Sequence, residues 1–246
     1  MKAMIFAAGL GTRLKPITLA KPKALVRLKG KSMLVRVAEK LIAAGVTDIV
    51  VNIHHHGDAL ETFIRKLYYP GVRFHISDET DQLLDTGGGL KKAAGLLQGD
   101  EAIFLYNSDV LCDINLADML RAHNQHRPLA TLAVTRRMSP RHFLWLDGKL
   151  AGWENTVTGE KIRCRDLANR QPEAMAFSGI HLVEPDILPL ITENGRFSIR
   201  QLYLRLARDY DLMAYVHEAR YWADIGTPGK LKHAARLLEQ YPERFQ

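Results

Sequence analysis

The residues best suited to chemistry lie within the first 23 positions of the chain. Gly9 and Gly11 follow a short apolar segment, and because they carry no Cβ atom the backbone there can turn sharply and approach a ligand. Successive N–H groups in such a turn can form a concave site for an anion. Arg13 adds a guanidinium that suits phosphate oxygens, and Lys23 adds a point charge. The pattern predicts a phosphate-binding loop; a tight turn between a strand and a helix is the alternative.

The spacing of these glycines differs from two common nucleotide-binding loops. Leu14 stands where the third glycine of the dinucleotide pattern G-x-G-x-x-G would lie. No Gly-Lys-Ser/Thr sequence closes the loop, as it would in a P-loop. The prediction is therefore phosphate binding by a loop of another type.

Two aspartates far apart in the sequence each follow a strand-like segment. Asp109 comes after the apolar run at 102–106, and Asp224 lies just before the C-terminal helical segment. Each could be an ordinary turn or capping residue. Together they could hold one divalent cation, because Mg²⁺ is bound by one or two carboxylates together with substrate phosphates.

A second glycine-rich segment lies at 85–90. Its glycines could simply open a helix, or they could let a flat base or ribose lie against the backbone. Glu79 and Asp81, just upstream, are candidates for contacts with a base.

Strand-like and helix-like segments alternate along the first half, which predicts a mainly parallel sheet with right-handed crossovers. Ligands of such sheets bind beyond the carboxyl ends of the strands, where the glycine loop and Asp109 lie. The second half is less regular, and residues 153–175 read as loop-rich. The predicted strands are 4–8, 48–53, 72–77, 102–106, 130–135, 144–146, 149–151, 176–181 and 212–216. The predicted helices are 32–44, 58–67, 89–97, 198–206 and 227–240.

The composition is that of an ordinary soluble globular protein, and its basic residues favour small anionic ligands. A chain of 246 residues fits one domain, and no apolar run reaches the roughly 20 residues that a membrane helix needs. The net charge is +7, and many of the basic residues lie near the glycine loop. They are not interleaved with aromatic residues in the way that is typical of nucleic-acid binding. Cys112 and Cys164 have no metal or redox spacing, which indicates a reducing, cytoplasmic setting. The three histidines at 54–56 are adjacent in one loop and are not expected to share an ion.

Residues 9–23 resemble the signature G-x-G-T-R-L-x-P-x-T followed by P-K of the sugar-1-phosphate nucleotidyltransferases. The segments N-S-D at 107–109 and W-A-D-I-G-T-P at 222–228 resemble that family's metal-binding segments, with Ser108 where the family often has glycine. The resemblance implies a Rossmann-like three-layer α/β/α fold of the nucleotide-diphospho-sugar transferase type in one domain, 1–246. Within it, residues 1–125 would form the nucleotide-binding half and 126–246 the sugar-phosphate-binding half.

The resemblance also implies a role for each candidate residue. The nucleotide would contact Ala8, Gly9, Gly11, Thr12, Arg13, Glu79, Thr86, Gly87 and Gly88. The sugar phosphate would contact Lys23, Asn107, Glu154, Asn155 and Gly179. Mg²⁺ would be held by Asp109 and Asp224, and the catalytic residues would be Arg13, Lys23 and Asp109. Arg136, Arg137 and Arg141 either contact the sugar's phosphate or form a basic surface run.

The implied reaction joins a nucleotidyl group from an NTP to a sugar 1-phosphate and releases pyrophosphate. UTP with N-acetylmuramate 1-phosphate is the first choice of substrates. A mannose or heptose 1-phosphate guanylyltransferase, a cytidylyltransferase acting on a phosphorylated alcohol, and a non-catalytic nucleotide-binding regulator are the alternatives. The expected partners are small molecules, without nucleic acid or membrane, and the expected state is a monomer or homodimer.

Overall fold

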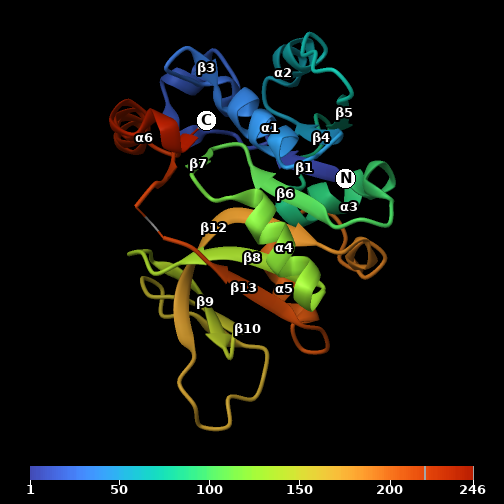
Figure 1. Cartoon of the computed structure of the whole chain (residues 1–246), viewed down its shortest axis with the longest axis vertical. Coiled ribbons are helices and arrows are strands. Elements are labelled where there is room, and N and C mark those ends of the chain that lie inside the picture. Colours follow the sequence, from blue (N-terminus) through green and yellow to red (C-terminus); the bar gives the residue numbers. More distant parts are fainter. Residues whose placement is uncertain (219, 246) are drawn as a thin grey trace.

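Side chains that alternate along the first strand divide the interior into two cores. β1 (Lys2–Phe6) directs Ala3 and Ile5 to one face of the sheet and Met4 and Phe6 to the other. The computed structural model describes residues 1–218 and 220–245. In it, α1, α2 and α4 cover the face of Ile5, and α3 and α5 cover the face of Met4 (Figure 1). The predicted three-layer α/β fold is confirmed.

The helices are α1 (Met33–Ala43), α2 (Gly57–Ile64), α3 (Asp85–Leu97), α4 (Leu116–His126), α5 (Ile199–Leu206) and α6 (Pro228–Gln240). The strands that follow β1 in the first half are β2 (Arg27–Leu28), β3 (Lys31–Ser32), β4 (Asp48–Ile53), β5 (Arg73–Asp78), β6 (Ile103–Asn107) and β7 (Val110–Cys112). The remaining strands are β8 (Ala130–Thr135), β9 (Arg141–Leu146), β10 (Lys149–Asn155), β11 (Lys161–Arg163), β12 (Glu173–Val183), β13 (Leu212–Val216) and β14 (Trp222–Asp224).

The central sheet is mixed, and its parallel part carries the glycine loop. The order is β11-β10-β13-β8-β12-β6-β1-β4-β5, with β9 paired to β10 and β12. Strands β5, β4, β1 and β6 run parallel, as does the pair β8–β13, and β12 joins its neighbours antiparallel. The chain leaves β1 and β6 at the same edge, so the segments after Phe6 and Asn107 lie close together.

Three predicted strands, 48–53, 130–135 and 212–216, match the structure at both ends. Residues 153–175 are less irregular than predicted, because β10 continues to Asn155, β11 follows it and β12 begins at Glu173. α4 was not predicted, although the side chain of Asn115 caps it by accepting hydrogen bonds from Ala117 and Asp118. The short strands β7 and β14 were not predicted either.

A third apolar cluster holds the glycine loop against the C-terminal helix. Leu14, which follows the loop, packs with Leu111 of β7, Ile225 beside β14 and Leu237 of α6. Arg13 and Asp224 are each next to a residue of this cluster in the sequence, and Asp109 lies two positions before another.

A buried polar network fixes the exit of the chain from β1. The side-chain oxygen of Asn52 accepts hydrogen bonds from the N–H groups of Ala7 (2.6 Å) and Ala8 (3.3 Å). Its amide nitrogen donates to Glu79 (2.7 Å), whose second oxygen accepts from the N–H of Leu84 (3.2 Å). Burial raises the pKa of Glu79, although these hydrogen bonds act in the opposite direction. Asn52 therefore links the first glycine-rich loop to the segment before the second.

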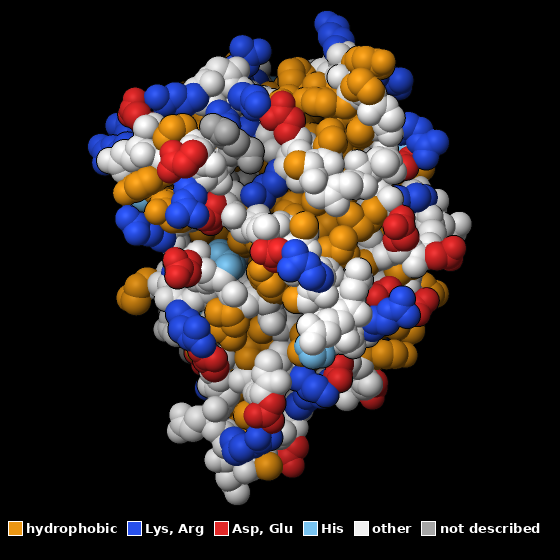
Figure 2. Space-filling view, viewed as in Figure 1, with side chains coloured by type: hydrophobic (Ala, Val, Ile, Leu, Met, Phe, Trp, Pro, Cys, Tyr) orange, Lys and Arg blue, Asp and Glu red, His pale blue; other side chains and the backbone are white. Residues whose placement is uncertain are grey.

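Charged side chains of both signs are interspersed over the face in Figure 2, rather than gathered into one basic stripe. Among the described residues, no helix combines the length and apolar character required to cross a membrane.

We predict that Asn52→Leu lowers the free energy of unfolding by about 2–4 kcal/mol, because it leaves two buried N–H groups and one oxygen of the buried Glu79 carboxylate without partners. Urea denaturation measures the loss. Asn124→Leu, at an exposed position of α4, is the matched control and should change stability by less than about 0.5 kcal/mol. Equal stability of the two variants would show that the network does not stabilise the fold.

Candidate functional site

Two adjoining cavities open at the carboxyl ends of β1 and β6. The first has a volume of about 370 Å³ and the second about 660 Å³, and they share Asp85, Thr86 and Asn107. The first is lined by Phe6, Ala7, Ala8, Gly9, Leu10, Gly11, Thr12, Arg13, Lys23, Asn52, Glu79, Leu83, Ser108, Asp109, Arg196 and Gly226. The second is lined by Arg137, Ser139, Arg141, Phe143, Trp153, Asn155, Glu160, Phe177, His181, Ser198, Ile199, Arg200 and Tyr203.

The glycine loop forms one wall of the first cavity. Gly11 has a φ of +62°, and a Cβ atom there would lie 2.8 Å from Cγ2 of Thr18. The hydroxyl of Thr18 donates to the carbonyl of Gly11 (2.8 Å), which fixes the turn. The exposed side chains of Thr12 and Arg13 follow in a single 3₁₀ turn, Thr12–Leu14, and both line the cavity.

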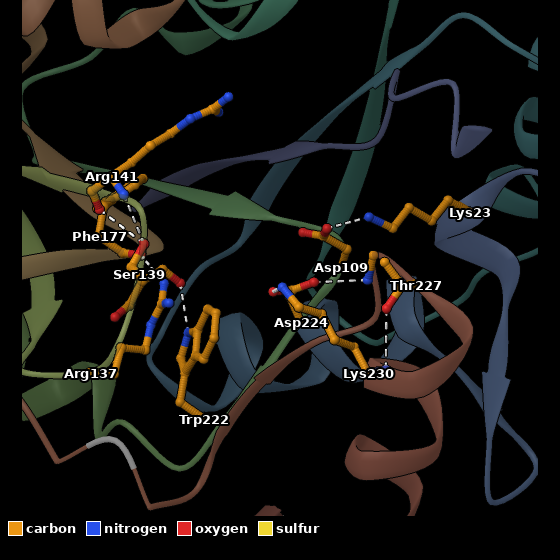
Figure 3. Close-up of polar contacts among 12 residues, drawn as sticks. Lys23, Asp109, Arg137, Ser139, Arg141, Phe177, Trp222, Asp224, Thr227 and Lys230 are labelled. Carbon is orange, nitrogen blue, oxygen red and sulfur yellow. Dashed lines mark hydrogen bonds and ion pairs between the residues drawn. The ribbon is translucent and has the colours of Figure 1, made fainter. Parts of the chain in front are cut away.

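The two predicted metal aspartates come together through a short antiparallel ladder. β7 pairs with β14 so that Asp224 lies opposite Val110, the neighbour of Asp109. The side chains of Asp109 and Asp224 lie next to each other in Figure 3. Among the described residues, Asp109 forms its ion pair with Lys23, and Asp224 forms its ion pair with Lys230 of α6.

Gly226 marks the point where the charged groups meet. A Cβ atom at this residue would lie 2.7 Å from Oδ1 of Asp224, 3.4 Å from Nη2 of Arg13 and 3.8 Å from Nζ of Lys23. Since Lys23 also contacts Asp109, the glycine loop, the lysine and both aspartates surround the same space. The N–H of Gly226 donates to Asp224 (2.8 Å).

The surroundings of Asp224 keep its carboxylate charged. Burial alone would raise the pKa of Asp224, but the hydrogen bonds from Lys230 and the Gly226 N–H, with the charges of Lys230 and Lys23, outweigh burial and lower the pKa. The carboxylate is therefore ionised at neutral pH.

The acidic pair supplies only part of a metal-binding shell. Among residues 1–218 and 220–245, no three His, Cys, Asp or Glu side chains are placed to hold one ion. Two carboxylates suit Mg²⁺ when substrate phosphates and water complete the shell. His54 instead contacts the carbonyl of Glu79 (2.6 Å), and the rings of His55 and His56 lie 4.1 Å apart against each other.

The second glycine-rich segment is placed differently from the prediction. Gly87 and Gly88 belong to the first turn of α3 and are buried, and both of their N–H groups donate to the carbonyl of Phe197. A Cβ atom at Gly87 would collide with the ring of Phe197, and one at Gly88 would lie 2.5 Å from the carbonyl oxygen of Gly195. These glycines permit close packing against residues 195–197 and line neither cavity, and their contact with the nucleoside stays a prediction.

Thr86 and Glu79 differ in their exposure to the two cavities. Thr86 lines both cavities, and its hydroxyl accepts a hydrogen bond from the N–H of Ile199 (3.0 Å). Glu79 adjoins the first cavity but is 0% exposed, and both of its carboxylate oxygens accept hydrogen bonds from the protein. Glu79 therefore supports the glycine loop through Asn52, and its contact with the base stays a prediction.

The predicted sugar contacts divide between the two faces of the β9–β10 hairpin. Asn155 is paired with Arg141 across the hairpin, and both line the second cavity. Glu154 projects to the opposite face and pairs with Lys161 of β11 (3.1 Å), and its contact with the substrate stays a prediction. Asn107 lines both cavities. Gly179 has a φ of +80° and leaves space for the Asn107 side chain, because a Cβ atom at Gly179 would lie 2.8 Å from Nδ2 of Asn107.

Several lining residues were not predicted from the sequence. Asn52 is a polar residue inside an otherwise apolar strand, which is a signal that sequence reading could have used. Gly226 lies within the segment that resembles the family. No motif in the sequence marks Arg196 and Arg200 as site residues. They reach the cavities because their segment packs against α3.

Comparisons with known proteins identify the family of this chain. A sequence model described as "Nucleotidyl transferase" matches residues 2–241. The N-acetylmuramate alpha-1-phosphate uridylyltransferase of Caulobacter vibrioides is 33% identical, over 96% of this chain and 97% of that protein. A mannose-1-phosphate guanyltransferase of Gibberella zeae is 31% identical, over 93% of this chain but 61% of that longer protein.

Solved structures share the fold at lower identity. A UDP-glucose pyrophosphorylase from Acinetobacter baumanii superposes with a TM-score of 0.80 at 15% identity, over 99% of this chain and 95% of that one. The inositol-1-phosphate CTP transferase of T. maritima gives a TM-score of 0.75 at 17% identity, over 98% and 96% of the two chains. With the sequence match across nearly the whole chain, the protein belongs to the nucleotidyl transferase family and, within it, to the sugar-1-phosphate nucleotidyltransferases.

Proposed function

We propose that the chain transfers a uridylyl group from UTP to N-acetylmuramate 1-phosphate and releases pyrophosphate. The observation that carries the proposal is the meeting of the glycine loop, Lys23 and the two aspartates where the first cavity borders the second. Residues 1–125 supply most of the first cavity and would bind the nucleotide. Residues 126–246 supply most of the second cavity and would bind the sugar phosphate.

The acceptor is itself an anionic oxygen nucleophile, so the reaction needs no general base. One oxygen of the acceptor phosphate attacks the α-phosphorus, and the bond from that phosphorus to the bridging oxygen of the β-phosphate breaks. The protein must align the two phosphates and offset their repulsion. The N–H groups of residues 8–12, with Arg13, would bind the triphosphate, and Lys23 would contact phosphate oxygens beside the reacting phosphorus.

The acidic pair fits a divalent cation such as Mg²⁺. In this structure two lysine ammonium groups pair with the carboxylates of Asp109 and Asp224, so the local chemistry already favours positive charge there. When bound, a divalent cation would neutralise phosphate charge and draw electrons from the α-phosphate. Lys23 and Lys230 are then free to contact phosphate oxygens.

The choice of acceptor rests on the second cavity and on the Caulobacter vibrioides relative. Arg141 and Arg200 line this cavity, and neither forms an ion pair with a carboxylate of the described residues. Phe143, Trp153 and Phe177 add apolar surface, and the guanidinium of Arg200 lies 3.9 Å from the centre of the Trp153 ring. N-acetylmuramate carries a carboxylate and a methyl-bearing acetamido group, which complement charged and apolar walls respectively.

A guanylyl transfer to mannose 1-phosphate is the second candidate, because several mannose-1-phosphate guanyltransferases are 29–31% identical over most of this chain. The Caulobacter vibrioides relative is 33% identical to this chain, slightly more than these guanyltransferases, which favours the uridylyl reaction.

We predict that Lys23→Ala and Asp109→Asn each lower kcat/KM by about 10²-fold, the scale of losing one preorganised charge. Asp224→Asn should have a similar effect and should raise the Mg²⁺ concentration that gives half-maximal rate. Pyrophosphate release measures the rates, and Mn²⁺ binding followed by electron paramagnetic resonance measures metal affinity separately. Lys29→Ala, which removes an exposed lysine paired with Glu239, is the control.

Unchanged turnover in the Lys23 or Asp109 variant would remove that residue from the mechanism. Mn²⁺ affinity that is the same in the wild type and in both aspartate variants would show that the acidic pair does not hold the metal.

The substrates can be assigned with a grid of four NTPs against several sugar 1-phosphates. We expect UTP with N-acetylmuramate 1-phosphate to give a kcat/KM at least about tenfold above UTP with N-acetylglucosamine 1-phosphate, which lacks the carboxylate. Arg200→Gln should reduce that ratio by weakening binding of the acidic acceptor alone. A higher rate with GTP and mannose 1-phosphate would replace this assignment with the second candidate.

A further inference from the structure

Arg137 is a half-buried arginine whose position is fixed by two contacts in the second half of the chain. Its Nη2 atom donates to the carbonyl of Phe177 on β12 (2.8 Å). Its guanidinium lies over the ring of Trp222 on β14, 3.9 Å from the ring centre (Figure 3). Trp222 is itself fixed by a hydrogen bond from its indole N–H to the carbonyl of Ser178 (2.9 Å). The guanidinium is therefore held by a backbone carbonyl and an aromatic ring.

The charge of this guanidinium is not balanced by a neighbouring carboxylate. Among residues 1–218 and 220–245, Arg137 forms no ion pair, and its buried Nε atom has no hydrogen-bond partner. Burial lowers the pKa of Arg137, and the charge of Asp224 acts in the opposite direction. The adjacent Arg136 differs on each point, since it is exposed and pairs with Glu173.

The location of Arg137 connects the acidic pair with the second cavity. Trp222 and Asp224 are two residues apart on β14, so their side chains project from the same side of the strand. Arg137 stacks on that side and also lines the second cavity, together with Asn107, which lines both cavities. Arg137 thus connects the lining of the second cavity, through Trp222, with the strand that carries Asp224.

We propose that Arg137 binds the phosphate of the acceptor 1-phosphate and holds it for attack on the α-phosphorus. This inference rests on the proposed function. A guanidinium can bind two phosphate oxygens through a fork of N–H donors, which leaves the third oxygen free to form the new bond to phosphorus. The leaving group is pyrophosphate, and no proton is transferred in this step. Stacking on Trp222 fixes the plane of the fork before the acceptor binds.

The test compares Arg137→Gln, Arg137→Lys and the matched control Arg136→Gln, which removes the same charge from the neighbouring residue. Initial rates of pyrophosphate release are measured with the NTP and the acceptor varied separately. We expect Arg137→Gln to lower kcat/KM for the acceptor by about 10²-fold and to leave KM for the NTP within about twofold of the wild type. Arg137→Lys keeps the charge but not the fork, so the loss should be about tenfold. Arg136→Gln should behave as the wild type.

Thermal unfolding of each variant separates a folding defect from a binding defect, and Arg137→Lys keeps the test decisive if Arg137→Gln does not fold. The inference is overturned if a folded Arg137 variant has a normal KM and kcat for the acceptor, or if KM for the NTP rises as much as KM for the acceptor. A wild-type protein that releases no pyrophosphate with any pair of NTP and sugar 1-phosphate would overturn the proposed function itself, and this inference with it.

Discussion

The site depends on one short antiparallel ladder, in which β7 and β14 pair over three residues each. This pairing places Asp224 beside the strand that follows Asp109, although 115 positions separate the two residues in the numbering of the chain. Two neighbouring carboxylates of like charge repel each other, and the ion pairs with Lys23 and Lys230 offset this repulsion. In the proposed mechanism the same two lysines supply positive charge for a polyphosphate.

The surrounding structure serves to keep this ladder in register with the glycine loop. An apolar cluster joins Leu14, Leu111, Ile225 and α6, and therefore ties the loop to both strands of the ladder. On the other side, Asn52 binds the N–H groups of Ala7 and Ala8 and fixes the backbone where it leaves β1. Glu79, which could have been a ligand-binding carboxylate, is used to hold Asn52 instead. Binding residues thus lie on loops whose ends are fixed by buried contacts.

Much of this could be predicted from local sequence, because the local signals and the fold agree. Continuous apolar runs identified the strands at 48–53 and 130–135, and the hydroxyl side chains of Ser32, Ser198 and Thr227 cap helices as expected. The glycine loop and both aspartates were also identified, because they follow strand-like segments and their neighbours resemble the signature segments of the family.

The remaining features depend on contacts between distant segments. A β-bulge between Leu150 and Gly152 shifts the register of the β9–β10 hairpin and decides that Asn155, and not Glu154, faces the cavity. The run Gly87–Gly89 packs against Phe197, which is distant in the sequence, and against Glu79, which lies outside α3. Its packing role could therefore not be predicted from the glycines alone. Arg137 likewise gains its position from Trp222 and Phe177.

A crystal structure with a bound nucleotide diphosphate sugar and Mg²⁺ tests the central claim most directly, namely that one polyphosphate binds to the glycine loop and the acidic pair together. The account predicts a diphosphate against the N–H groups of residues 8–12, with a single ion bonded to the carboxylates of Asp109 and Asp224 and to a phosphate oxygen. A diphosphate bound elsewhere, or an ion that touches neither aspartate, would contradict it.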